Sequence, residues 1–100
     1  MTKSISVIEL RSRLASNEHL HLIDVRQPEE HEEFALANSL LIPLRELPER
    51  VGELEALKHE ELIIYCRSGN RSNQACMFLE LSGFTNVCHV AGGMLAWGKQ

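Results

Sequence analysis

The chain has 100 residues, of which 44% are hydrophobic and 24% are charged, a composition typical of one soluble globular domain over residues 1–100. Its formal charge of −4 argues against nucleic acid as a partner, and no apolar run approaches the ~18 residues that cross a bilayer. Three cysteines and an N-terminus without an apolar signal region favour a reduced, cytoplasmic protein.

The first half of the chain predicts short strands that alternate with helices. Ile5 begins an extended piece, and Ser6 with Glu9 three residues later is the pattern of a capping box, which predicts a helix over residues 7–15. The elements that follow are a strand at 20–25, a short acidic helix at 29–34 and a third strand at 40–42.

The second half continues the alternation. Its predicted elements are a helix at 48–57 weakened by Gly52, a buried strand at 62–65, a helix at 72–81 that ends before Gly83, a strand at 87–90, and a turn leading into a short helix over 91–97. The pair Gly92-Gly93 fits either a close approach of the backbone to a neighbouring loop or a plain helix-entry turn. Strands separated by helices predict an α/β fold, with a central parallel sheet of about five strands and helices on both faces.

A polar loop at residues 66–72 lies between the strand at 62–65 and the helix after it. Cys66 opens this loop, which turns successive backbone N–H groups inward at the positive end of the helix dipole. Such a loop stabilises an anion, so we expect Cys66 to be a thiolate and the catalytic nucleophile. The residues expected to bind the substrate are Arg67, Ser68, Gly69, Asn70, Arg71 and Ser72.

The distribution of charge also points to this loop. Residues 29–61 contain ten glutamates, whereas residues 62–98 contain only Arg67, Arg71 and Glu80 as charged residues. Both cations of that acid-poor half lie in the cysteine loop, which is what an anion site requires. The alternative is that they are two solvated arginines of an ordinary loop.

Three further residues are candidates for supporting the site. Ligands of parallel sheets bind beyond the carboxyl ends of the strands, where we expect both the cysteine loop and the turn that contains Asp24 and Arg26. Arg71 closes the loop, and a carboxylate, Glu30 or Asp24, is expected to brace it.

Four segments in chain order resemble the signatures of the rhodanese family. They are residues 22–30 (Leu-Ile-Asp-Val-Arg-Gln-Pro-Glu-Glu), 42–44 (Ile-Pro-Leu), 64–72 (Ile-Tyr-Cys-Arg-Ser-Gly-Asn-Arg-Ser) and 92–97 (Gly-Gly-Met-Leu-Ala-Trp). The resemblance implies a single rhodanese-like domain with sulfurtransferase activity and no cofactor or metal. Cys66 would take a sulfane sulfur from a small anionic donor such as thiosulfate, hold it as a persulfide, and pass it to cyanide, a thiol or a protein acceptor.

The chain departs from the family pattern in two places. His31 stands where the family usually has an aromatic residue, and Phe34-Ala35-Leu36 replaces a common Gly-His-Ile. The basic loop favours thiosulfate over mercaptopyruvate as the donor.

Other functions remain as alternatives. Cysteine phosphatases and arsenate reductases use Cys-x₅-Arg, whereas Cys66 and Arg71 form Cys-x₄-Arg. A non-catalytic rhodanese-like binding or regulatory module would not need the thiol. A dithiol redox role lacks a Cys-x-x-Cys motif, and Cys76 and Cys88 are expected in the core.

Overall fold

Five parallel strands form the centre of the molecule, in the order β1-β5-β4-β2-β3. The computed structural model describes residues 3–16 and 18–98. The strands are β1 (Lys3–Ile5), β2 (His21–Asp24), β3 (Leu40–Leu41), β4 (Leu62–Tyr65) and β5 (Val87–Val90). The predicted parallel α/β sheet is confirmed, although the extended piece that we expected to begin at Ile5 ends there instead.

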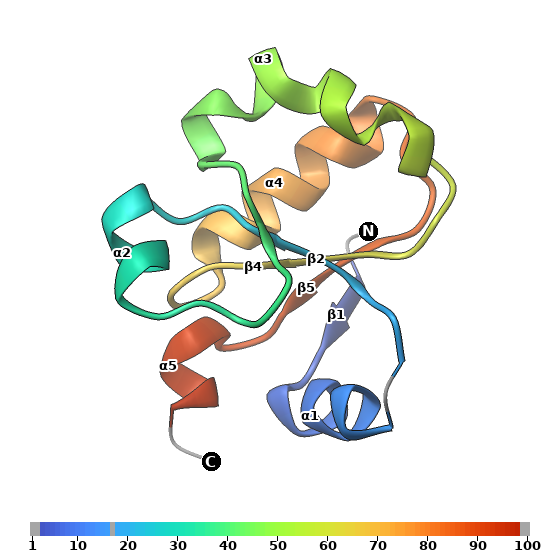
Figure 1. Cartoon of the computed structure of the whole chain (residues 1–100). Coiled ribbons are helices and arrows are strands. Elements are labelled where there is room, and N and C mark those ends of the chain that lie inside the picture. The colour runs from blue at the N-terminus through green and yellow to red at the C-terminus, as the bar shows by residue number, and fades with distance from the viewer. Residues whose placement is uncertain (1–2, 17, 99–100) are drawn as a thin grey trace.

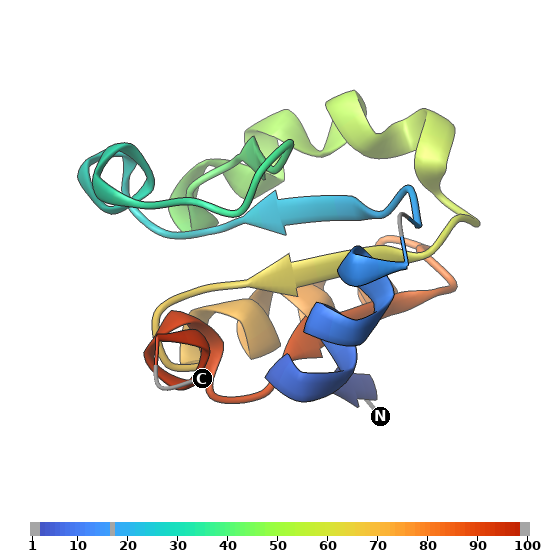
Figure 2. The same cartoon turned by 60° about the horizontal axis from the view of Figure 1, so that its bottom comes forward.

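Helices cover both faces of the sheet, as Figures 1 and 2 show. One face packs against α4 (Asn70–Leu81) and α3 (Leu47–Arg50). The other face packs against α1 (Val7–Ala15) and α5 (Gly93–Trp97). A further short helix, α2 (Pro28–Glu33), follows the carboxyl end of β2. No helix among the described residues has the length and apolar character needed to cross a membrane.

The central strand β4 contributes to both cores. Leu62 and Ile64 face the core under α4, whereas Ile63 and Tyr65 face the core under α1 and α5. All four side chains are fully buried. Because both faces are covered, the strand is apolar throughout instead of alternating with polar residues.

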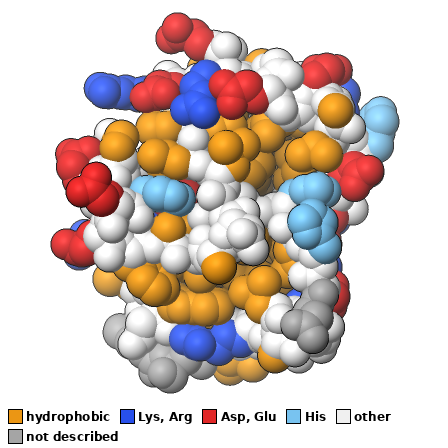
Figure 3. Space-filling model, viewed as in Figure 1, with side chains coloured by type: hydrophobic (Ala, Val, Ile, Leu, Met, Phe, Trp, Pro, Cys, Tyr) orange, Lys and Arg blue, Asp and Glu red, His pale blue; other side chains and the backbone are white. Residues whose placement is uncertain are grey.

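The prediction of a single α-helix over residues 48–57 is wrong. The α-helical part is limited to α3, and it is followed by a 3₁₀ helix over Val51–Leu57. Gly52 lies in this 3₁₀ segment, where its low helix propensity agrees with the change. Leu47 and Leu54 are buried and anchor the segment. Acidic and basic side chains cover its outer edge at the top of Figure 3.

Helix α4 begins two residues earlier than predicted, because Asn70 and Arg71 already belong to its first turn. Its end agrees with the prediction, since Gly83 has a φ of 95° and its N–H donates to the Glu80 carbonyl. Helix α4 therefore starts inside the cysteine loop, which brings its first N–H groups to Cys66.

Candidate active site

Cys66 directly follows β4 and lies beneath the loop, with no exposed surface. The Gly69 N–H donates to Sγ at 3.0 Å and the Ser72 N–H donates to it at 3.3 Å. The Ser72 hydroxyl oxygen lies 3.4 Å from the same sulfur. Gly69 has a φ of 113°, a conformation that favours glycine, and this turns its N–H toward the sulfur. The predicted inward-facing N–H groups are therefore present around Cys66.

Two opposing influences act on the pKa of Cys66. Burial is the largest influence and raises the pKa, because it disfavours the thiolate. The hydrogen bonds of the sulfur with the Ser72 side chain and with the backbone of Ser72, Gly69 and Ser68 lower the pKa. Together these hydrogen bonds outweigh burial, so the pKa of Cys66 lies below that of an ordinary thiol.

The other two cysteines are buried, and no described residue donates a hydrogen bond to either sulfur. Burial raises the pKa of Cys76 to about 12 and also raises the pKa of Cys88. Both side chains belong to the core, as expected.

The three pKa shifts predict different pH dependences of alkylation. Because only the thiolate reacts, alkylation of Cys66 by iodoacetamide should reach its half-maximal rate at a lower pH than alkylation of Cys88 or Cys76. A pH series read by peptide mass spectrometry measures this order. The midpoint of each curve is compared instead of its height, since burial slows the access of reagent to all three sulfurs. Coincident midpoints for Cys66 and Cys88 would contradict the thiolate assignment.

Helix α5 holds the loop from the other side. The Met94 N–H donates to the Cys66 carbonyl and the Leu95 N–H donates to the Arg67 carbonyl, both at 2.9 Å. The backbone approaches this closely because of Gly93, which has a φ of 57°. A Cβ at Gly93 would lie 2.5 Å from the Cys66 carbonyl oxygen. Of the two interpretations of the glycine pair, the structure therefore shows the close approach to the loop.

Arg71 binds Glu30, one of the two carboxylates expected to brace it. Its guanidinium group donates from Nη1 and Nη2 to the two carboxylate oxygens of Glu30 at 2.8 and 3.0 Å. Glu30 also accepts the Gln27 N–H at the start of α2. The bond from Arg71 is the largest influence on Glu30 and holds the pKa of its carboxyl at about 2. The ion pair thus joins α2 to the cysteine loop.

This ion pair predicts a pH-dependent loss of stability. A carboxyl with a pKa of about 2 when folded and 4.5 ordinarily stabilises the fold fully above pH 4.5, and this contribution disappears as the pH falls toward 2. Glu30→Gln should lower the free energy of unfolding at neutral pH by about 1–2 kcal/mol. The difference from the wild type should shrink over that acidic range, as measured by thermal unfolding.

The matched control is Glu29→Gln, because Glu29 is an exposed residue of the same helix. It should leave the melting temperature nearly unchanged. A Glu30→Gln effect that stays constant from neutral pH to pH 2 would show that the carboxylate charge is not what stabilises this contact.

Arg67 is exposed and has no ion-pair partner among the described residues. It lines a pocket of about 260 Å³ beside the cysteine loop, with Glu30, Phe34, Met94 and Leu95 among the other lining residues. The structure thus separates the two loop arginines, since one braces the fold and the other is free. The side chains of Ser68 and Asn70 are exposed on the same loop.

Asp24 and Arg26 form a buried ion pair at the carboxyl end of β2. Arg26 donates to both carboxylate oxygens of Asp24 at 2.8 and 2.9 Å, and its Nη2 donates to the Phe34 carbonyl at 2.6 Å. His31 Nδ1 lies 2.9 Å from the same carboxylate. These contacts hold His31 and Phe34, which are two of the positions where the chain departs from the usual rhodanese pattern.

His89 lies beside the cysteine loop, which the sequence analysis did not predict. Its Nδ1 lies 3.4 Å from the Ser72 hydroxyl oxygen, and burial lowers the pKa of this histidine. His89 is two residues after Val87, which faces the core under α4. A polar residue on the buried face of a strand was the available signal. Among the described residues, no group of three or more His, Cys, Asp or Glu side chains is placed to hold a metal ion.

Known proteins are similar to this chain both in sequence and in fold. The rhodanese-like domain family matches residues 6–100. A sulfurtransferase of Allochromatium vinosum is 36% identical over 99 residues, which cover 99% of this chain and 91% of that protein. The thiosulfate sulfurtransferase PspE of Escherichia coli is 35% identical over 72 residues, which cover 72% of this chain and 69% of that protein.

A solved structure agrees with these sequence relatives. The crystal structure of a rhodanese-like domain protein from Staphylococcus aureus matches with a TM-score of 0.89 and 34% identity, covering 97% of this chain and 92% of that one. The five-stranded parallel sheet and the helices that flank it agree with this match. This chain therefore belongs to the rhodanese-like domain family.

Proposed function

We propose that this sulfurtransferase moves a sulfane sulfur from thiosulfate, or a related anionic donor, to a thiophilic acceptor through a persulfide on Cys66. The observation that carries the proposal is the pair of backbone N–H groups, of Gly69 and Ser72, that donate to Sγ. They lower the pKa of the Cys66 thiol and so favour the thiolate, which is the nucleophilic form of a cysteine. The similarity to a thiosulfate sulfurtransferase of Escherichia coli supports the choice of donor.

The first half-reaction loads the enzyme. The Cys66 thiolate attacks the outer sulfur of thiosulfate, the sulfur–sulfur bond of the donor breaks, and sulfite leaves with the electron pair. The product Cys66–S–S⁻ carries the same single negative charge as the thiolate. Because no proton is taken from the nucleophile in this step, the site needs no general base.

The second half-reaction removes the sulfur atom from Cys66. An acceptor such as cyanide or a thiolate attacks the outer sulfur of the persulfide, and the Cys66 thiolate is regenerated as the leaving group. The N–H groups of the loop face an anion before and after each step, so they need no rearrangement during the cycle.

Arg67 is the group proposed to attract the anionic donor, because its guanidinium is exposed and free of partners among the described residues. Arg67→Ala should raise KM for thiosulfate with a smaller loss in kcat, lowering kcat/KM by about five- to thirtyfold. Steady-state thiocyanate formation from thiosulfate and cyanide measures both constants. Added salt should weaken turnover by the wild type more than by the variant, because salt screens an exposed charge.

An organic persulfide with no other charged group is the control for this experiment, because it carries one negative charge instead of the two of thiosulfate. Its kcat/KM should fall less in Arg67→Ala than the kcat/KM for thiosulfate. Unchanged thiosulfate kinetics in the variant would exclude Arg67 as the donor-binding cation and would count against thiosulfate as the donor.

The cysteine phosphatase alternative requires an arginine that is free to clamp two phosphoryl oxygens. Arg71 is the candidate, but it uses Nη1 and Nη2 to bind Glu30. This contact, together with the Cys-x₄-Arg spacing, favours sulfur transfer over phosphoryl transfer. A non-catalytic binding module has no use for the depressed pKa of Cys66.

We further propose that the protein acts in a reducing compartment such as the cytoplasm. All three cysteines, Cys66, Cys76 and Cys88, are free thiols in the structure. Disulfide formation would compete with persulfide chemistry at Cys66 in an oxidising compartment.

A further inference from the structure

The Ser72 hydroxyl has three polar neighbours but only one proton to donate. Ser72 lies in the first turn of α4 and is fully buried. Its hydroxyl oxygen lies 3.1 Å from the Gly69 carbonyl oxygen, 3.4 Å from Cys66 Sγ and 3.4 Å from His89 Nδ1. A hydroxyl donates one hydrogen bond and accepts up to two. The direction of this single proton therefore determines whether Ser72 stabilises a thiolate at Cys66.

Ionisation of Cys66 changes what the sulfur requires from Ser72. A thiol can donate its proton to the Ser72 oxygen, and the hydroxyl proton is then available to the Gly69 carbonyl. A thiolate has no proton and can only accept, so the hydroxyl must turn its proton to Sγ. After burial, which raises the pKa of Cys66, the hydrogen bond with the Ser72 side chain has the largest influence on that pKa and lowers it. The Ser72 proton thus matters for the nucleophile.

The sheet brings His89 to the same hydroxyl. His89 lies on β5, where it pairs in register with Ile64 of β4. Cys66 follows Ile64 by two residues, so it continues the same face of the neighbouring strand. Cys66 and His89 therefore both reach the first turn of α4 from adjacent strands, and Ser72 lies within 3.4 Å of each.

The tautomer of His89 determines what its Nδ1 offers to Ser72. A neutral imidazole carries its proton on one of the two ring nitrogens. An unprotonated Nδ1 would accept the hydroxyl proton and draw it away from Cys66. An Nδ1–H group would instead donate to the hydroxyl oxygen and leave the hydroxyl proton for the sulfur.

We propose that His89 is a positioning residue for the nucleophile: its Nδ1–H donates to the Ser72 oxygen, and this directs the Ser72 proton to the Cys66 thiolate. His89 would act through Ser72 and would touch neither the donor nor the transferred sulfur. The inference rests on the proposed function, because it concerns the nucleophile of that reaction. A chain of two hydrogen bonds, from Nδ1–H to the hydroxyl and from the hydroxyl to Sγ, is most favourable when it ends on an anion.

The surroundings of His89 favour a role through hydrogen-bond direction instead of charge. Burial lowers the pKa of His89, which favours the neutral ring. The other titratable side chains on the elements around it are Lys3 on β1, Tyr65 and Cys66 at β4, Cys88 on β5, and Arg71, Cys76 and Glu80 on α4.

Most of these groups are engaged elsewhere or lie on another face. Lys3 donates to Asn86, and Arg71 is paired with Glu30. Tyr65 and Cys88 face the core under α1 and α5. Burial raises the pKa of Cys76 to about 12, so this thiol is neutral. Glu80 lies near the opposite end of α4 from Ser72. Cys66 is therefore the titrating group to which His89 is connected, through Ser72.

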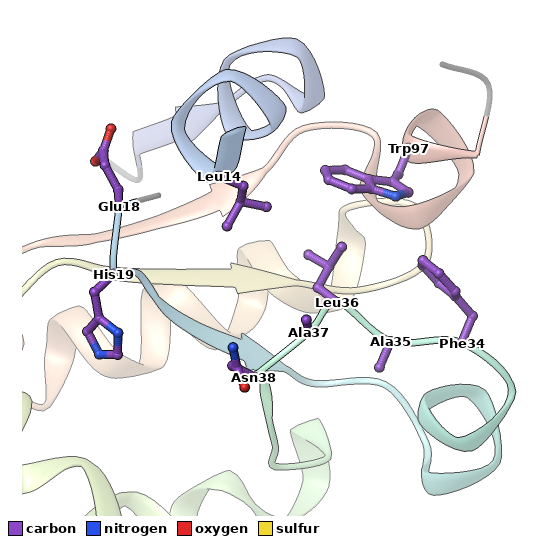
Figure 4. Close-up of a pocket in the computed structure, with 9 residues that line it drawn as sticks. All are labelled: Leu14, Glu18, His19, Phe34, Ala35, Leu36, Ala37, Asn38 and Trp97. Carbon is purple, nitrogen blue, oxygen red and sulfur yellow. The ribbon is translucent and has the colours of Figure 1, made fainter. Parts of the chain in front are cut away.

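The other four histidines contact groups outside the cysteine loop. His21 lies 3.4 Å from Glu60, His31 contacts Asp24, and His59 contacts Thr85. His19 packs against the ring of His21 and lines a groove of about 640 Å³ with Leu14 and Trp97, as Figure 4 shows. Leu14 and Trp97 belong to the core under α1 and α5, on the face of the sheet opposite α4.

The test measures the pH at which alkylation of Cys66 by iodoacetamide reaches half its maximal rate. His89→Phe keeps a flat ring without a donor and should raise this midpoint by about 0.5–1 pH unit. His89→Asn places an amide N–H near the position of Nδ1 and should bring the midpoint back to within about 0.2 units of the wild type. His89→Leu replaces the phenylalanine variant if thermal unfolding shows that the latter does not fold.

The rate of sulfur loading from thiosulfate gives a second readout. Below the midpoint, His89→Phe should load about three- to tenfold more slowly than the wild type, because a smaller fraction of Cys66 is ionised. Above the midpoint the two rates should agree within about twofold. A variant that merely disturbs the packing of the loop would load more slowly at every pH, and that result would contradict the positioning role.

Ser72→Ala shows whether His89 acts through the hydroxyl. This substitution should raise the alkylation midpoint by itself, and adding His89→Phe should then shift it no further. The matched control is His59→Phe, because His59 Nδ1 lies 3.1 Å from the Thr85 hydroxyl oxygen and is exposed outside the loop. It removes a similar contact between a histidine and a hydroxyl and should leave the midpoint of Cys66 unchanged.

Nitrogen-15 NMR of the histidine rings tests the tautomer directly. At a pH above the midpoint of Cys66, the proton of His89 should reside on Nδ1. A proton on Nε2 would overturn the inference, as would an unchanged midpoint in His89→Phe or an equal shift in the Ser72→Ala background. None of these results would affect sulfur transfer through Cys66. Failure of the wild type to take up sulfur from thiosulfate would overturn the proposed function instead, whatever the midpoints are.

Discussion

Cys66→Ser is expected to abolish sulfur transfer while leaving the fold intact. A serine hydroxyl has a far higher pKa than a thiol, so it is not ionised by the Gly69 and Ser72 N–H groups that lie at 3.0 and 3.3 Å from Sγ. Thiocyanate formation from thiosulfate and cyanide should fall at least about a thousandfold. The melting temperature should stay near that of the wild type, because serine is close in size to cysteine and the same donors remain available to its oxygen.

The matched controls are Cys76→Ser and Cys88→Ser. Both sulfurs are buried and their pKa values are raised, so neither is a nucleophile at neutral pH. These variants should keep turnover, with a loss of about 1–3 kcal/mol in the free energy of unfolding from burying a hydroxyl. Loss of turnover in a folded Cys76→Ser variant would contradict a mechanism that uses one cysteine.

Gly93→Ala is expected to damage both the stability and the activity of the protein. The new Cβ would lie 2.5–2.6 Å from backbone atoms of Cys66 and Arg67, which are not free to move aside. Gly93 also has a φ of 57°, so the substitution adds backbone strain. We expect a loss of about 2–4 kcal/mol in the free energy of unfolding and a melting temperature lower by about 10 °C or more.

The activity of Gly93→Ala should fall by about tenfold or more, because α5 holds the carbonyls of Cys66 and Arg67 through the Met94 and Leu95 N–H groups. The matched control is Gly52→Ala. A Cβ at Gly52 meets no atom within 4 Å, so this variant should keep its activity and its melting temperature. If Gly93→Ala behaves like Gly52→Ala in unfolding and turnover assays, α5 does not brace the loop.

Much of this architecture follows from local patterns in the sequence. The strand at Leu62–Tyr65 and the helix after it were predictable, because an apolar run covered on both faces and a helical pattern ending at Gly83 are short-range signals. The parallel arrangement followed from the alternation of strands and helices. The single helix over residues 48–57 was predicted wrongly, because the pattern of apolar residues does not distinguish an α-helix from the 3₁₀ helix found at Val51–Leu57.

In the site, the local features of the loop were predictable, whereas the contacts between distant residues were not. The order of residues in the loop indicated Cys66 and the turn of N–H groups, which are local features. The role of Arg71 depended on which carboxylate lies beside it in space, and only the structure selects Glu30 instead of Asp24. The contact between His89 and Ser72 joins residues 17 apart in the chain. Strand alternation indicates the face on which His89 lies, but it does not identify Ser72 as its partner.

The mass of the intact protein after incubation with thiosulfate tests the central claim most directly. The wild type should gain the mass of one sulfur atom, peptide mapping should place that atom on Cys66, and cyanide should remove it with the release of thiocyanate. Cys66→Ser should gain nothing, whereas Cys76→Ser and Cys88→Ser should gain one sulfur atom each. A wild-type protein that gains no sulfur, or that carries it on Cys76 or Cys88, would contradict the proposed persulfide mechanism.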